Sequence, residues 1–171
     1  MTRKSGLIAC WVIAAAFACN SEDHTEVIVA EVPLDSLDEV ITKSGVEMDA
    51  EVTSDGRGSL RVNASQPARV RIAEVDGLTV DDAQLIYRAR LRSRELRGHA
   101  FLEMWCVFPG QGEFFSRALQ SPLTGTNDWV TQETPFLLKE GQTPSRVVLN
   151  LIVEGQGTVW LDDIVLAKTP L

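Results

Sequence analysis

The 171-residue chain contains few of the residues on which enzyme active sites depend: it has two histidines, three cysteines and one tyrosine. Neither His24 nor His99 belongs to a metal-binding spacing such as HExxH. The sequence also has no GxSxG nucleophile motif and no phosphate-binding glycine loop. Acidic pairs are so frequent in this chain that they carry no information about a glycosidase site. We therefore predict that the protein is not an enzyme.

Basic residues are scarce relative to acidic ones, with 16 Lys and Arg against 24 Asp and Glu and a net charge of −8. This balance argues against nucleic acid as a partner, because its phosphates need neutralisation by Lys and Arg. An acidic surface suits an exported protein and a hard cation such as calcium. Hydrophobic residues make up 44% of the chain and charged residues 23%, which is typical of a globular protein.

Long hydrophobic runs are also absent, apart from Leu7–Ala18 near the start of the chain. These residues would form about 18 Å of helix, which is too short for a bilayer core of roughly 30 Å. Arg3 and Lys4 precede the run, and polar residues follow it. This order predicts a signal peptide over residues 1–18 and a polar tether over residues 19–26, with a buried N-terminal helix as the alternative.

Cys19 directly follows Ala16-Phe17-Ala18, a small-x-small sequence that is typical of signal cleavage. This arrangement resembles the lipobox of bacterial lipoproteins, although Ala16 replaces the usual leucine and Phe17 is bulky. The resemblance implies lipidation of Cys19 and a cell-envelope protein that meets the membrane through this anchor alone. The alternative is ordinary cleavage and a secreted or periplasmic protein. Cys106 would have no disulfide partner, and we predict a buried, unreactive thiol there.

Strand-like runs recur between turn signals along the rest of the chain, and only Ser36-x-x-Glu39 indicates a helix start, with the helix ending near Gly45. This pattern predicts one domain over residues 27–171 that is an all-β, antiparallel jelly-roll sandwich. The expected strands cover residues 27–32, 46–53, 59–64, 68–75, 84–93, 100–108, 114–120, 129–138, 146–154 and 158–168.

Four motifs in this region carry a family resemblance. Ser54–Val62 (SDGRGSLRV) resembles the opening, and Gly157–Leu166 (GTVWLDDIVL) the closing strand, of galactose-binding-like β-sandwich modules. Between them, Leu85–Leu91 and Gly125–Trp129 resemble an inner strand and a turn of the same modules, in the expected order. The resemblance implies a galactose-binding-like fold. That fold hosts carbohydrate-binding modules, adhesion domains and structural modules, so it leaves the function open.

Alternation along three of the expected strands places apolar side chains on one face and a distinctive polar set on the other. If these strands pair, a flat aromatic ring and forked hydrogen-bonding groups share one face, which suits a carbohydrate site. The alternative is a solvated sheet face with ordinary cross-strand ion pairs. The candidate ligand-binding residues are Arg88, Arg90, Glu103, Trp105 and Asn150.

Asp162 and Asp163 are neighbours on the last expected strand, so one carboxylate must point inward or toward an edge and needs a partner there. The family resemblance implies a structural calcium that is bound by an acid of this strand and an N-terminal loop. Asp35 is the preferred loop partner, and Asp38 and Glu39 are further candidates. Calcium needs six to eight oxygen ligands. The alternative is that Asp162 or Asp163 caps backbone amides in a turn. The sequence indicates no other cofactor.

A second aromatic group comprises Phe114, Phe115 and Trp129, which we predict to close the ends of the sandwich core rather than to form a rim. Taken together, the sequence predicts an exported, non-catalytic binding module for a carbohydrate or glycan. The alternative is a structural or protein-interaction lipoprotein of the envelope with no small-molecule ligand.

Overall fold

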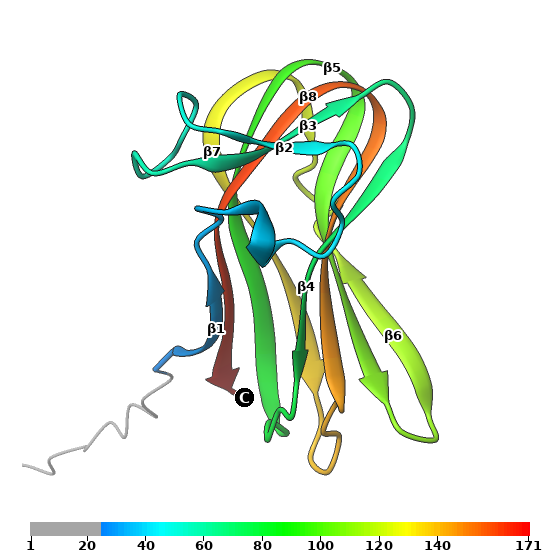
Figure 1. The fold of residues 1–171 in the computed structure, drawn as a ribbon. Helices are drawn as coiled ribbons and strands as arrows, with labels where there is room; N and C mark the ends of the chain where they lie inside the picture. Colours follow the sequence, from blue (N-terminus) through cyan, green and yellow to red (C-terminus); the bar gives the residue numbers. More distant parts are fainter. Residues whose placement is uncertain (1–24) are drawn as a thin grey trace, which may run out of the picture.

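The computed structural model describes residues 25–171, so the expected signal peptide and Cys19 lie outside the described residues. The described chain folds as β-strands with one short 3₁₀ helix, Leu37–Glu39, and no helix in it is long and apolar enough to cross a membrane (Figure 1). The strands are β1 (Val27–Val32), β2 (Val46–Asp49), β3 (Ser59–Ala64), β4 (Ala68–Asp76), β5 (Ala83–Phe108), β6 (Gly112–Arg117), β7 (Leu123–Leu138) and β8 (Arg146–Pro170).

Two long strands, β5 and β8, form the frame of the molecule. They pair antiparallel from Ala83 opposite Pro170 to Val107 opposite Arg146. Both strands bend over at the top of the molecule in Figure 1, where the register shifts between Arg94 and Arg97. Each strand therefore contributes one half to each of two layers. The sequence predicted four separate strands here, which was wrong because the bend does not interrupt the hydrogen-bonded ladder.

Glycines allow β5 and β8 to approach closely at this bend. Gly98 has φ 120°, and a Cβ placed there would overlap the carbonyl oxygen of Glu154. A Cβ on Gly155 would overlap the carbonyl oxygen of Arg97 in the same way. A side chain at either position would therefore push the two strands apart.

The first layer contains residues 83–94 of β5 between β7 and residues 158–170 of β8, with β1 and β3 on the far side of β8 and β2 beyond β3. The second layer contains residues 100–108 of β5 between β6 and residues 146–154 of β8, with β4 on the far side of β8. These layers form the predicted antiparallel sandwich.

The core lies between the two layers and follows the predicted alternation. Leu85 and Tyr87 of the first layer and Met104 and Leu149 of the second layer are fully buried in one hydrophobic cluster. Cys106 belongs to the same cluster, and burial raises the pKa of its thiol to about 12. The prediction that Cys106 is buried is confirmed, and the raised pKa keeps its thiol protonated at neutral pH.

The helix that the sequence predicted after Ser36 is only a single 3₁₀ turn. The Ser36 hydroxyl accepts a hydrogen bond from the backbone N–H of Asp38 at 3.2 Å. The Glu39 carboxylate accepts one from the backbone N–H of Leu34 at 2.8 Å. Ser36 is therefore the N-cap as the motif indicated, but Glu39 bonds to Leu34 and not to Ser36, so the capping box is not closed. The helix ends at Glu39 and does not continue to Gly45.

Candidate ligand-binding site

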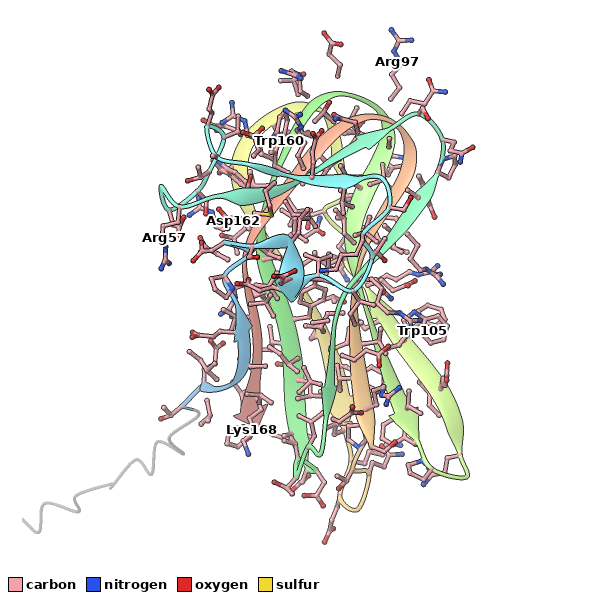
Figure 2. All side chains as sticks on the ribbon, viewed as in Figure 1. Arg57, Arg97, Trp105, Trp160, Asp162 and Lys168 are labelled. Atoms are coloured by element: carbon pink, nitrogen blue, oxygen red, sulfur yellow. The ribbon has the colours of Figure 1, made fainter. Side chains whose placement is uncertain are left out.

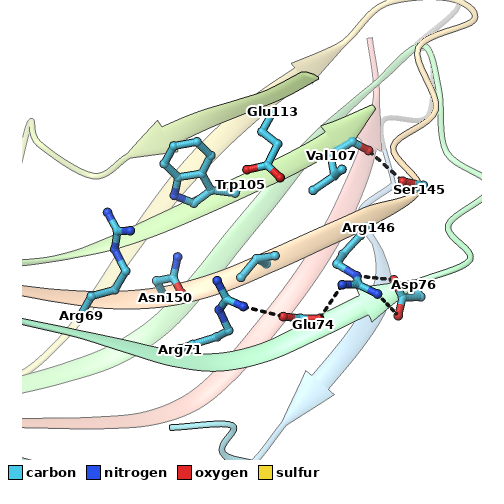
Figure 3. Close-up of a pocket in the computed structure, with 11 residues that line it drawn as sticks. Arg69, Arg71, Glu74, Asp76, Trp105, Val107, Glu113, Ser145, Arg146 and Asn150 are labelled. Carbon is cyan, nitrogen blue, oxygen red and sulfur yellow. Dashed lines mark hydrogen bonds and ion pairs between the residues drawn. The ribbon is translucent and has the colours of Figure 1, made fainter. Parts of the chain in front are cut away.

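A cavity of about 420 Å³ lies on the outer face of the second layer (Figure 3). This volume is within the range of about 300–1,000 Å³ that is usual for small-molecule sites. Side chains of β4, β5, β6 and β8 converge on it, because alternate residues of neighbouring strands point to the same face. The lining residues are Arg69, Arg71, Glu74, Asp76, Trp105, Val107, Glu113, Ser145, Arg146, Val148 and Asn150.

An aromatic platform stands beside this cavity. Trp105 is half-buried and faces Phe115 of β6, with the ring centroids 4.9 Å apart. The guanidinium of Arg117 lies 4.5 Å from the centroid of the Phe115 ring. Figure 2 shows Trp105 on the β6 side of the molecule. The stack Trp105–Phe115–Arg117 thus presents two flat rings at the molecular surface, and we call it the aromatic platform.

The structure corrects the prediction that Phe114 and Phe115 lie in the core. Phe114 is 51% exposed and Phe115 is 50% exposed. Both belong to β6, an edge strand paired only with β5, so neither ring is covered by a further strand. Phe114 makes an edge contact with Phe108 at 5.9 Å between ring centroids, whereas Phe115 packs on Trp105. Trp129 lies in β7 and is partly buried.

Beneath the aromatic platform, Glu103 is completely buried and holds four strands together. Its carboxylate accepts hydrogen bonds from Arg117 Nε at 2.6 Å and from Asn150 Nδ2 at 3.2 Å. Arg69 Nε lies 3.3 Å from the same carboxylate. A buried carboxylate needs such partners, because an unpaired charge is strongly penalised away from water. Glu103 therefore organises the site from below and does not form its surface.

Further ion pairs fix the opposite end of the cavity, as Figure 3 shows. Glu74 binds Arg71 at 2.9 Å and Arg146 at 3.0 Å. Arg146 also binds Asp76 at 2.7 Å. These contacts hold the arginine side chains in defined positions, and they balance positive charge with negative charge around the cavity.

The amide of Asn150 is the most unusual polar group in the site. Asn150 is 1% exposed, and its Nδ2 group donates to Glu103. Among residues 25–171, its Oδ1 atom is buried and has no hydrogen-bond partner. An unsatisfied buried acceptor costs about 1–3 kcal/mol. A ligand hydroxyl or a water molecule that reaches Oδ1 would recover this loss.

The structure brings together Glu103, Trp105 and Asn150 of the predicted site but not Arg88 and Arg90. Arg88 lies on the outer face of the first layer, opposite Glu133 and Val165. It binds Glu26 at 2.8 Å and Glu133 at 3.1 Å, and its hydrogen bonds with these carboxylates raise its pKa.

Arg90 also lies on the first layer, opposite Thr131 and Asp162. The prediction that the five residues share one face is therefore wrong for both arginines, Arg88 and Arg90. The prediction failed because the bend near Gly98 carries residues 83–94 and residues 100–108 of β5 into different layers.

Sequence reasoning missed Arg69 and Arg71 of β4, Arg146 of β8 and the platform role of Phe115. One signal was present, because alternation along residues 68–75 places Arg69 and Arg71 on the same face. That β4 lies beside β8, and so beside Asn150, was not contained in the pattern.

Asp35, Asp162 and Asp163, which were expected to bind calcium, do not form a metal-binding site. Asp162 is completely buried and accepts hydrogen bonds from the backbone N–H groups of Ser54 and Asp163, both at 2.9 Å. Asp163 accepts one from the Ser54 hydroxyl at 2.5 Å. Asp35 lies 3.7 Å from the guanidinium of Arg57. Within residues 25–171, no group of three or more His, Cys, Asp and Glu side chains is placed to hold a metal ion.

The contacts of Asp162 match the alternative interpretation, in which Asp162 or Asp163 caps backbone amides, whereas Asp163 binds a side-chain hydroxyl. Asp162 and Asp163 fix the loop between β2 and β3 onto β8. Burial raises the pKa of Asp162, although hydrogen bonds from Ser54 oppose this effect.

Comparison with solved structures identifies the fold. No protein-family model and no curated protein sequence matches the chain. The CBM22-1 xylan-binding domain from Paenibacillus barcinonensis Xyn10C is similar in structure, with 14% identity, a TM-score of 0.57, and coverage of 85% of this chain and 96% of that domain.

A second xylan-binding domain from CBM 22 gives 13% identity and a TM-score of 0.55, covering 82% of this chain and 94% of that one. A family 16 carbohydrate-binding module gives 10% identity and a TM-score of 0.53, covering 71% and 84%. The chain therefore has the β-sandwich fold of carbohydrate-binding modules. This result confirms the predicted all-β, antiparallel, galactose-binding-like class.

Proposed function

We propose that the protein is a non-catalytic, exported module that binds a carbohydrate on the outer face of the second layer. The observation that carries this proposal is the aromatic platform beside a cavity lined by fixed polar groups. The similarity in fold to two domains described as xylan-binding supports it.

The chemistry of the site suits a sugar ring. A pyranose has a flat apolar face that packs on an aromatic ring, and Trp105 and Phe115 offer such rings at the surface. Its hydroxyl groups need donors and acceptors in fixed positions. Arg69 supplies donors, and the unpartnered Oδ1 of Asn150 supplies an acceptor. Because their side chains are already held by Glu103, little conformational entropy is lost when a ligand binds.

The test compares two neighbouring phenylalanines that are equally exposed. The purified domain would be run through native gels that contain soluble xylan, β-glucan or galactan. Phe115→Ala removes half of the platform and should weaken binding at least about tenfold, a typical effect for a central aromatic contact. Phe114→Ala removes an equally exposed ring that faces away from Trp105 and should leave binding unchanged.

The same gels can refute the proposal. Absence of retardation by any polysaccharide, or equal loss in both variants, would contradict carbohydrate binding at the platform. The alternative, a protein-interaction lipoprotein, would then be tested by capture of envelope proteins on the wild-type domain and on Phe115→Ala.

The proposed export and lipid anchoring rest on the sequence of residues 1–19. Metabolic labelling of the full chain with radioactive palmitate should label the wild type and not Cys19→Ser. Labelling of neither protein would favour ordinary cleavage and a secreted or periplasmic location.

A further inference from the structure

The outer face of the first layer carries a row of arginines along β5. Arg88, Arg90, Arg92 and Arg94 alternate with buried residues, so their side chains share one face at intervals of about 7 Å. Arg97 follows at the bend and projects from the top of the molecule in Figure 2. This concentration of positive charge is unexpected in a chain with a net charge of −8.

Three of these arginines have no carboxylate partner. Every other arginine of residues 25–171 forms an ion pair with Asp or Glu, whereas Arg90, Arg94 and Arg97 form none. The Nε atom of Arg90 is buried and has no hydrogen-bond acceptor within the described chain. The guanidinium of Arg94 lies 5.3 Å from the centroid of the Trp160 ring. We call Arg90, Arg94 and Arg97 the arginine stripe.

Acidic side chains border the stripe and define the shape of its partner. Asp128 and Glu133 of β7 lie on one side, where they pair with Arg92 and Arg88. On the other side, the buried Asp162 of β8 is in register with Arg90, and Glu31 of β1 lies two strands away, in register with Val165. A flat anionic surface would meet these acids together with the arginines. A single narrow chain could contact the stripe and avoid them.

The chemistry of the stripe also separates polysaccharides from single-stranded nucleic acids. Proteins that bind single-stranded nucleic acid without sequence specificity stack its bases on exposed aromatic side chains. Trp160, whose ring lies 5.3 Å from the Arg94 guanidinium, is 2% exposed and therefore cannot take a stacked base. Guanidinium groups bind sulfate and carboxylate oxygens through paired hydrogen bonds without any stacking partner.

We propose that the arginine stripe is a second binding site, which takes a linear polysaccharide that carries sulfate or carboxylate groups. The stripe runs along the first layer to the bend at Arg97, whereas the aromatic platform lies on the second layer. The site is therefore independent of the carbohydrate site proposed above.

The experiment uses dextran sulfate as the probe and neutral dextran as its uncharged control. Arg94→Gln/Arg97→Gln changes two exposed residues of the stripe and leaves the partly buried Arg90 in place. Lys139→Gln/Lys168→Gln removes the same charge from positions far from the stripe along the chain. At low salt, we expect about tenfold weaker binding for the arginine pair and less than about twofold for the lysine pair.

Several outcomes would overturn the proposal. These are equal losses in the two double variants, equal binding of neutral dextran, or tighter binding to phosphatidylglycerol vesicles or to oligo-dT than to dextran sulfate. Thermal unfolding of each variant checks that the fold is intact. Trp105→Ala should bind dextran sulfate as the wild type does, which separates failure at the aromatic platform from failure at the stripe.

Discussion

The two outer faces of the sandwich are built largely from the same two strands, β5 and β8, yet their chemistry differs. On the second layer, Glu103 and its arginine partners form a buried, balanced network beneath a pair of aromatic rings. On the first layer and at the bend, the arginines of β5 are exposed or partly buried, and three of them form no ion pair with an acid within residues 25–171. The outer face of the second layer is held in place by a buried ion-pair network, whereas the first layer carries arginines without ion-pair partners in the described chain.

This difference arises because each long strand is used twice. The inward positions are odd-numbered before the bend in β5, as for Leu85, and even-numbered after it, as for Leu102. The register shift near the bend makes this change. The same strand can therefore present two independent outer surfaces while contributing to a single core.

The largest effect should come from the residue that permits the bend. Gly98→Ala would force a Cβ into the carbonyl oxygen of Glu154, and we expect a loss of about 3 kcal/mol or more in the free energy of unfolding. Binding at both proposed sites should be lost together. Urea unfolding provides the measurement.

Gly110→Ala is the matched control for this substitution. Its φ of 73° also favours glycine, but a Cβ there would meet no atom within 4 Å. We expect a loss of only about 1 kcal/mol. Equal losses at the two positions would show that close strand approach at Gly98 is unimportant.

A smaller loss of stability should follow when the buried network of the second layer loses the negative charge of Glu103. Glu103→Gln leaves Arg69 and Arg117 without a carboxylate, and we expect a loss of about 2 kcal/mol because both guanidiniums are partly hydrated. Arg88→Gln breaks ion pairs on the first layer that are nearer to solvent, and it should cost about 0.5 kcal/mol. Chemical denaturation measures the free energy of unfolding of both variants. Equal losses would contradict the organising role of Glu103.

Truncation of the platform should affect binding more than stability. Trp105→Ala removes a half-buried ring, so we expect a loss of about 1–2 kcal/mol in the free energy of unfolding, less than for a fully buried tryptophan. Polysaccharide binding should fall below detection in native gels. A loss of 4 kcal/mol or more would mean that Trp105 acts mainly as a core residue.

The smallest effect is a difference between Asp162 and Asp49 of the first layer in how their contributions to stability depend on pH. Burial raises the pKa of Asp162 above its ordinary value of 3.8. Between that value and the raised one, the folded state binds more protons than the unfolded state, so the contribution of Asp162 to stability falls as pH rises. Asp162→Asn should remove this fall, as unfolding midpoints from about pH 4 to about pH 6 would show.

Asp49 should behave in the opposite way. Burial acts to raise its pKa, but hydrogen bonds from Trp160 Nε1 and from the backbone of Val52 and Glu51 hold it below 3.8. Its contribution to stability is therefore present above about pH 4 and is lost as pH falls through the lowered pKa. Identical pH profiles for Asp49→Asn and Asp162→Asn would contradict this contrast.

Much of the fold could be read from the sequence because strand periodicity and turn residues are local properties. The alternation in residues 85–91 and 102–108 predicted the correct inward set, including Cys106. The motifs at residues 54–62 and 157–166 predicted the galactose-binding-like class. The prediction of separate strands failed at Gly98, because the close approach of β8 there is a tertiary contact.

The sequence by itself determined which side chains of residues 85–91 and 102–108 point toward the core, since a strand alternates every two residues. It could not determine which outward residues meet. Only the tertiary structure separated Arg88 and Arg90 from Trp105, placed Arg69 beside Glu103 and exposed Phe115 on an edge strand. The physical reason is that strand order and the bend of β5 depend on contacts between residues far apart in the chain, which local periodicity does not encode.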